Sequence, residues 1–555
     1  MNGPQWLESI TEVSGQDPLG IQVISISIYG YLLPGMTNVS SRLRYYTFLC
    51  WVLFNYSKKI QSKKIVDWQK YLRKAEFLFA LIADMHHINE KGFNSSCVGS
   101  ETTRQLIRNN KEEAISLIDY TKFEESPKRY FKNKGGGFMQ YYQGPMKQLM
   151  LIAEGGPLRC KIADNIAKTQ EKRFGIDAVE AFSSNLFLDL FHNCLIEGHV
   201  TRTQLKNMGD SLCACKIIGN NKEHSLLTNL LFNKNNISKN SGQRRKNTLH
   251  LIMHIIKGYS NKGITIDQFL DVCMYEYYPD GSKIRNKSHF KDILHSWFIY
   301  QTHEYFSFAL QSLLFLFEKT IDIIQDNFDD VFNYIQRDTL VNNISDIHSL
   351  KEFSNIDFKN TINLKVFLDS IAFSNEDELN WNNNRTSEYY LSLQIKRFTK
   401  EDNLAAILYS AIIILGKIYL KTSKTGNFYN GFDIDLKNKY RININFLNLF
   451  LNNNLNNNLW LLIKKIIREF IIERHSIVAL RKLRYEKRST LRFTTENQKY
   501  VRTSKINYDY PVHTSPRLAT AFNFLKDLGF IDNVSNNQYI ITKGGLKFLE
   551  SLDEI

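Results

Sequence analysis

Residues 515–555 read SPRLATAFNFLKDLGFIDNVSNNQYIITKGGLKFLESLDEI and contain the clearest structural pattern in the chain. Apolar side chains recur at helical spacing from Leu518 to Leu525, so they form one face of a predicted helix. Ser515-Pro516 supplies a typical N-cap with proline at the first helical position, and Gly529 supplies the C-cap. The stretch therefore predicts a helix that ends at a glycine turn.

A wing and a second helix are expected after this turn. Residues 532–538 are polar, residues 539–542 are rich in β-branched side chains, and Thr542 can cap a helix at 543–552. The order of helix, wing and capped helix resembles the winged-helix family. Ile541-Thr542-Lys543-Gly544-Gly545 is similar to the Leu-Thr-x-x-Gly motif of its MarR-like members. The resemblance implies a C-terminal winged-helix domain.

A similar pattern occurs in the N-terminal third. Met146–Ile152 (MKQLMLI) parallels Leu525–Ile531 (LKDLGFI), and the glycine-rich residues 155–159 lead into a predicted helix at 160–168. The wing between them would be much shorter than the C-terminal one. We therefore expect a possible second winged helix within residues 90–170.

The rest of the chain predicts a mostly α, multi-domain helical protein. Only 9 prolines occur in 555 residues, and helical periodicity dominates. We expect an N-terminal helical domain, a helical segment with a polar linker, a central helical domain, and a basic helix joined to the winged helix. These four parts would span 1–170, 171–247, 248–440 and 441–555, with the linker within 220–247 and a leucine-faced helix at 441–460.

Charge and cysteine content indicate the class of partner and the compartment. The formal net charge is +15, which favours polyanions such as nucleic acid. No signal peptide is expected at the N-terminus, and the apolar runs 45–56 and 404–420 fit buried helices better than membrane spans. The seven scattered cysteines indicate a reducing, cytoplasmic compartment. Cys213-Ala214-Cys215 has no matching second cysteine pair, so no zinc site or other metal is predicted.

An arginine-tyrosine motif near the N-terminus allows two interpretations. Arg42, Arg44, Tyr45 and Tyr46 could contact phosphate, but a buried helix start whose arginines pair with acids is the preferred interpretation. Together with the glycine-aromatic stretch 135–145, the motif resembles a group of uncharacterised bacterial proteins encoded in phage-defence-type operons. That resemblance implies a subunit of an antiviral defence complex.

The basic segment before the winged helix is the main candidate for nucleic-acid binding. A ridge of cations is expected where Arg481, Arg484 and Arg488 share a helical face, which suits a phosphate backbone better than base reading. An acidic protein surface is the alternative partner. The candidate binding residues are Arg474, Arg481, Lys482, Arg484, Lys487, Arg488, Arg492, Arg517 and Lys526.

Catalytic signatures are few. No P-loop sequence occurs, and no catalytic residue or cofactor is predicted. Asp433, Asp435 and Lys437 alternate on a predicted strand and could belong to a metal-dependent nuclease. The favoured interpretation is a non-enzymatic subunit that binds the DNA backbone without sequence specificity. It would dock an SMC-like ATPase, a helicase or a nuclease. The alternatives are that this chain is itself a metal-dependent nuclease, which would use Asp433, Asp435 and Lys437, or that it is a purely protein-binding scaffold.

Overall fold

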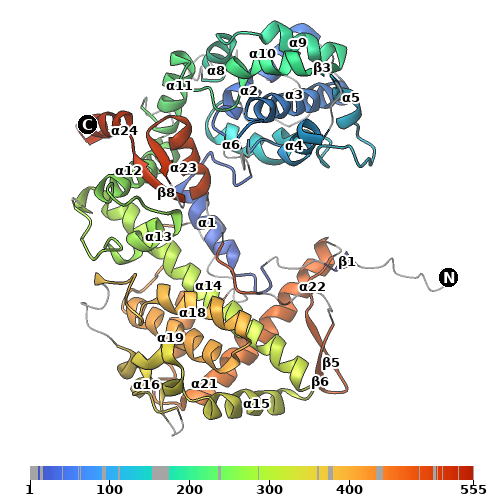
Figure 1. Cartoon of the computed structure of the whole chain (residues 1–555). Coiled ribbons are helices and arrows are strands. Elements are labelled where there is room, and N and C mark those ends of the chain that lie inside the picture. The colour runs from blue at the N-terminus through green and yellow to red at the C-terminus, as the bar shows by residue number, and fades with distance from the viewer. Residues whose placement is uncertain are drawn as a thin grey trace, which may run out of the picture. The chain divides into compact units, whose positions relative to one another are not determined.

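The protein is mostly helical, as the sequence predicts, and its described residues fall into two compact units (Figure 1). Unit 1 comprises residues 1–28 and 267–514, and unit 2 comprises residues 29–266 and 515–555. The computed structural model describes residues 11–12, 17–39, 42–60, 62, 64–90, 95–109, 113–152, 174–234, 239–285, 287–358, 362–372, 379–432, 442–486, 488–503, 508, 510–514, 517–534 and 537–553.

Unit 1 is built from helices and short strands. Its elements are β1 (Thr11–Glu12), the first part of α1 (Gln22–Leu32), α13 (Ile266–Tyr275), η3 (Lys287–Phe290), α14 (Lys291–Ile323), α15 (Phe328–Val341), η4 (Ile344–Asp346), η5 (His348–Phe353), α16 (Leu364–Ile371), α18 (Glu388–Glu401), α19 (Leu404–Thr422), α20 (Ile444–Asn452), α21 (Leu459–Lys465), η6 (Ile466–Glu473), α22 (Arg474–Glu486), β4 (Arg488–Ser489), β5 (Phe493–Glu496) and β6 (Lys499–Arg502). β1 pairs with β4 in parallel, and β5 and β6 form an antiparallel hairpin.

Two long helices form the core of unit 1. The 33-residue α14 packs against α15, α18, α19 and η6, and α19 packs in turn against α15, α16, α18 and α20. Helices that are covered on every side are apolar all round and have no single apolar stripe. α19 is long and apolar enough to cross a membrane, but most of its side chains are buried inside this unit. Its composition is therefore explained by its place in the core.

Unit 2 contains the N-terminal helices and the C-terminal elements. They are the second part of α1, α2 (Tyr45–Asn55), η1 (Tyr56–Ile60), α3 (Ile65–His86), α4 (Ser100–Asn109), β2 (Ala114–Ser116), α5 (Leu117–Tyr120), η2 (Phe138–Tyr142), α6 (Gln143–Gln148), α8 (Phe174–Ser183), α9 (Leu188–Glu197), β3 (His199–Thr201), α10 (Arg202–Leu212), α11 (Asn221–Leu231), α12 (Lys239–Gly258), α23 (Leu518–Asp527), β7 (Ile531–Val534), β8 (Gln538–Ile541) and α24 (Lys543–Asp553). α3 packs against α4 and α10, while α2 packs against α8.

The C-terminal elements follow the predicted order of helix, hairpin and helix. Gly529, at φ +72°, ends α23 in a Schellman turn, in which Phe530 N donates to Leu525 O at 2.9 Å. Thr542 caps α24 by accepting from Gly545 N at 2.9 Å. Ile264, which follows α12, pairs with Tyr539 of β8 and adds a third strand position beside the hairpin. Ser515-Pro516 lies outside the described residues, and the winged-helix assignment stays a prediction.

Two predicted features differ in the structure. The polar stretch predicted as a linker contains α11 and the start of α12, because its arginines are used inside the fold: Arg245 is buried and donates to Leu230 O and Leu231 O at 2.9 and 3.0 Å. The predicted leucine-faced helix is divided into α20 and α21 by a turn at residues 453–458. The second winged helix depends on residues 155–168, which lie outside the described residues.

Candidate nucleic-acid interface

The predicted basic segment begins in a long continuous helix. α21, η6 and α22 follow one another without a break, with π-helical hydrogen bonding in the middle third. The last part of this helix, α22, is the basic helix that the sequence predicts within residues 441–555. Along this helix the exposure of the cationic side chains differs sharply.

Three of the predicted binding residues are used inside unit 1. Arg474 is only 4% exposed, and its Nε donates to Leu19 O at 2.8 Å. Arg492 is 1% exposed, and its backbone N donates to His475 Nε2 at 3.1 Å. Lys482 donates from Nζ to Asp17 O at 2.9 Å. The contacts of Arg474 and Lys482 attach the segment at residues 17–19 to α22. Burial makes the side chains of Arg474 and Arg492 unavailable to a surface ligand.

Arg481 and Arg484 are exposed on α22, but the predicted three-residue ridge does not form, because the helix ends at Glu486 and Arg488 belongs to strand β4. Arg481 forms no ion pair with any residue that the structure describes. Ile477 and Leu480 lie on the same part of the helix and are 46% and 60% exposed. The accessible surface of α22 therefore combines two guanidinium groups with two apolar side chains. Lys487 and the side chain of Arg488 lie outside the described residues.

The other two predicted binding residues belong to unit 2. Arg517 Nη1 donates to Leu33 O at 3.3 Å, and its guanidinium lies 5.4 Å from the ring of Tyr29, in a setting where burial lowers the pKa of Arg517. Lys526 is half exposed, with Nζ 3.7 Å from Asp532 Oδ1. Lys526 is therefore opposed by a carboxylate, and the guanidinium of Arg517 already contacts a carbonyl oxygen and an aromatic ring in this unit.

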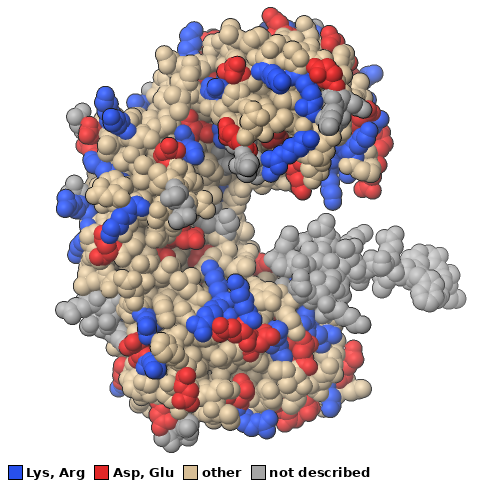
Figure 2. Space-filling view, viewed as in Figure 1, with Lys and Arg blue, Asp and Glu red and all other residues tan. Residues whose placement is uncertain are grey.

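Basic residues elsewhere are mixed with acids. On the face drawn in Figure 2, the coloured Lys and Arg side chains alternate with Asp and Glu and do not form one continuous basic patch. The β5–β6 hairpin gives an example, because Lys499 and Arg502 lie 3.7 and 3.1 Å from Asp326 and Asp322. Among the predicted site residues that the structure describes, Arg481 and Arg484 are the exposed ones on α22.

The arginine-tyrosine motif is structural, as the preferred interpretation states. Arg44 and Glu223 are fully buried and form an ion pair with Nη2–Oε2 at 2.9 Å. Arg42 pairs with Asp527 at 3.1 Å, and Leu43 N donates to the same carboxylate at 2.9 Å. Burial raises the pKa of Asp527 to about 6, although Arg42 opposes that change. The motif therefore connects the start of α2 to α11 and α23 and does not face solvent.

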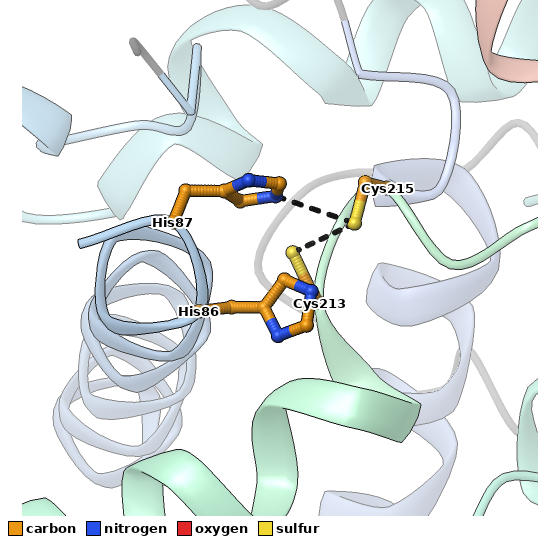
Figure 3. A group of neighbouring side chains, drawn as sticks. All are labelled: His86, His87, Cys213 and Cys215. Carbon is orange, nitrogen blue, oxygen red and sulfur yellow. Dashed lines mark hydrogen bonds between the residues drawn. The ribbon is translucent and has the colours of Figure 1, made fainter. Parts of the chain in front are cut away.

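The structure also forms a Cys–His cluster that the sequence analysis did not predict (Figure 3). His86 and His87 come from the end of α3, and Cys213 and Cys215 from the segment after α10. A zinc site was expected to need a second cysteine pair, whereas the structure brings a histidine pair to the cysteines. Two adjacent histidines and a Cys-x-Cys pair far apart in the chain were the available signal. The possible nuclease residues Asp433, Asp435 and Lys437 lie outside the described residues.

Comparison with protein-family models, curated proteins and solved structures gives no match.

Proposed function

We propose that the protein is a non-enzymatic subunit of a bacterial defence-type complex, which binds the nucleic-acid backbone without sequence specificity and docks an ATPase, helicase or nuclease. The observation that carries the proposal is the exposed pair Arg481 and Arg484 on α22. Two guanidinium groups on one helical surface can each contact a phosphate, and such contacts supply affinity without reading bases. The +15 net charge adds long-range attraction for a polyanion. We expect the protein to act in the cytoplasm.

The C-terminal elements support the same proposal at the level of fold. α23, the β7–β8 hairpin and α24, with Ile264 at a third strand position, match the order expected of a winged helix. The recognition-type helix is not strongly cationic, because Lys526 faces Asp532 and Arg517 is partly buried. The proposal therefore assigns backbone binding to α22 and a docking role to the C-terminal elements.

The test is binding of the purified protein to labelled duplex and single-stranded DNA across a salt series. The double variant Arg481→Glu/Arg484→Glu should weaken binding and reduce the slope of log affinity against log salt by about two. The control is Lys351→Glu/Lys365→Glu, which changes net charge equally at two exposed lysines of the same unit. An equal loss of DNA affinity in both double variants would overturn the assignment of backbone binding to α22. The absence of binding by the wild type at low salt would also overturn it.

A protein-binding scaffold is the second candidate, and the exposed Ile477 and Leu480 favour it. Apolar side chains beside arginines are typical of protein interfaces, whereas a phosphate backbone gives them no partner. This candidate predicts no DNA affinity at low salt. The metal-dependent nuclease is tested in the same assay, because Mg²⁺-dependent cleavage that disappears in Asp435→Ala would replace the proposal.

A further inference from the structure

The packing of α3 on α10 brings four metal-ligating side chains together in unit 2. His86 is the last residue of α3, and His87 follows it directly. His86 can approach α10 closely because Gly209 has no side chain: a Cβ at this position would lie 2.9 Å from His86 Nδ1. Cys213 and Cys215 come just after α10 ends at Leu212, so the two pairs face each other.

The distances within the cluster are those of a nearly closed coordination sphere. One ligand atom from each of the four residues lies within 4.8 Å of all the others. The two sulfur atoms are 3.2 Å apart, and His87 Nε2 is 3.4 Å from Cys215 Sγ. In a tetrahedral zinc site with bonds of about 2.0–2.3 Å, neighbouring ligand atoms lie about 3.3–3.8 Å apart. Side-chain adjustments of about 1 Å would therefore give tetrahedral geometry.

A second layer of contacts orients these side chains. His87 Nδ1 is 2.7 Å from Glu90 Oε1, which leaves Nε2 directed at Cys215 Sγ. Histidine ligands in metal sites typically bind a carboxylate through the other ring nitrogen in this way. Asp210 Oδ1 lies 3.7 Å from Nδ1 of His86 and supplies a second carboxylate. The main chain at Cys213 is also fixed, because Arg44 Nη1 donates to its carbonyl oxygen at 2.7 Å.

The surroundings of the cluster are cationic and partly open to solvent. Arg42 provides positive charge near both thiols. Cys213 is buried and the other three residues are partly buried, so the cluster lies near the surface of unit 2.

We propose that His86, His87, Cys213 and Cys215 form a structural Zn²⁺ site that joins the end of α3 to the segment after α10. Two thiolates and two imidazoles are a donor set that suits zinc, and four protein ligands leave no open position for a substrate. The site would also stabilise α23 indirectly. The short segment from Arg42 to Arg44 binds Asp527 of α23 at one end and the Cys213 carbonyl at the other.

The first experiment measures metal in the purified full-length protein by elemental analysis. We expect about one zinc per chain, and Co²⁺ replacement should give the charge-transfer and d–d bands of a tetrahedral cobalt–thiolate centre. Cys215→Ser and His87→Gln should each abolish stoichiometric zinc. Cys194→Ser is the matched control, because Cys194 is a buried thiol of the same unit outside the cluster. Wild-type protein without zinc and without a cobalt spectrum overturns the proposal.

Two further measurements keep the test valid if the ligand variants fail to fold. Alkylation of wild-type protein should spare Cys213 and Cys215 until a chelator is added, and zinc should then restore their protection. A Cys213–Cys215 disulfide would instead leave the protein two hydrogens lighter and the thiols unreactive after chelation, which contradicts the proposal. Glu90→Gln should lower zinc affinity about 10- to 100-fold in a competition assay, because Glu90 only orients His87. Unchanged zinc affinity would show that Glu90 does not orient His87 for metal binding.

Discussion

Three buried arginines of unit 2 donate hydrogen bonds to main-chain carbonyl oxygens at helix ends and in connecting segments. Arg44, Arg73 and Arg245 are all at most 2% exposed. Arg73 shows the pattern, since its Nε donates to Thr121 O at 2.9 Å and its Nη2 to Phe131 O at 3.0 Å. A planar guanidinium can satisfy several carbonyls in fixed directions, which a lysine ammonium cannot. These arginines therefore fix the conformation of the connecting segments.

Arg73→Lys should destabilise unit 2 by about 2–3 kcal/mol, because the carbonyls that Arg73 binds would lose their donors in a buried place. The measurement is the unfolding transition of the full-length protein in denaturant. Arg481→Lys is the control, since Arg481 is exposed and should shift the transition by less than about 0.5 kcal/mol. Equal effects would show that burial of Arg73 does not matter to stability.

The two glycines at the start of α24 should respond differently to the same substitution. A Cβ at Gly545 would lie 1.9 Å from the backbone oxygen of Phe530, whereas at Gly544 the nearest atom is 3.7 Å away. Gly545→Ala should therefore cost at least about 2 kcal/mol, while Gly544→Ala should be neutral or stabilise by up to about 1 kcal/mol through helix propensity. Thermal unfolding of the two variants side by side decides this, and a neutral Gly545→Ala would contradict the close approach of α24 to the backbone of Phe530.

Glu388 gives unit 1 an acid-sensitive contact. It accepts from Tyr275 Oη at 2.7 Å and lies 2.9 Å from Lys421 Nζ. Burial raises the pKa of Glu388, but Lys421 and Lys417 lower it more, to about 2. Because the folded pKa is below the unfolded value, the carboxylate adds stability above about pH 4.5 and loses it as the pH falls towards 2.

The expected size of this contribution is about 3 kcal/mol. Glu388→Gln should be less stable than wild type at pH 6, and the difference should shrink as the pH approaches 2. Denaturant titrations of both proteins at several pH values measure it. A constant difference at every pH would mean that the titration of Glu388 is not the cause.

At the scale of elements, α16 and α19 approach closely at one glycine. A Cβ at Gly416 would lie 2.5 Å from Ile371 Cδ1. Gly416→Ala should therefore destabilise unit 1 by about 1–3 kcal/mol. The double variant Gly416→Ala/Ile371→Val should recover part of that loss, because valine lacks the clashing methyl group. A double-mutant cycle of unfolding free energies measures the coupling, and strictly additive effects would contradict this contact.

Elements specified by local residues could be predicted, and those specified by distant contacts could not. Gly529 and Thr542 act on their own helix ends, so α23 and α24 end and begin as their sequences indicate. The polar residues of α12 look like a loop because the carbonyls that Arg245 binds are not evident in the sequence. The Cys–His cluster could not be predicted for the same reason, because α3 and α10 are far apart in the chain.

The candidate interface was predicted in part. Helical spacing correctly places Arg481 and Arg484 on an exposed surface. Spacing cannot reveal that Arg474 binds a carbonyl near the N-terminus, because Leu19 is 455 residues away. A cationic run in a sequence thus gives an upper limit to the basic surface, and tertiary contacts decide how much of it remains.

At the scale of the whole molecule, each unit is assembled from segments that are separated in the chain. Unit 2 is interrupted after residue 266 and resumes at residue 515, while unit 1 uses residues 1–28 together with 267–514. The four predicted domains are consecutive segments of the chain, and all three unit boundaries fall inside one of these segments. The polar run at residues 258–263 precedes this boundary, but a turn of this kind between two helices does not show that the following residues belong to another unit.

Removal of residues 515–555 should therefore affect unit 2 selectively. α12 would lose its contacts with α23, β8 and α24, and Phe232 would lose the ring of Phe548, 4.8 Å away. Calorimetry of the truncated chain should show that the unfolding transition of unit 2 is absent or occurs at a lower temperature. The transition temperature of unit 1 should be unchanged. The unit 2 transition is the one that Gly545→Ala shifts in the intact protein. A loss of both transitions would mean that unit 1 does not fold by itself.

The pairing of Ile264 with Tyr539 has a consequence for synthesis on the ribosome. Ile264 is translated long before its partner, and all of residues 267–514 emerge in between. During that interval the surface of α12 that later receives α23 and α24 has no cover, so the nascent chain would present apolar groups to chaperones. Slow translation of residues 267–514 would lengthen the time for which this surface of α12 is uncovered, and fast translation would shorten that time.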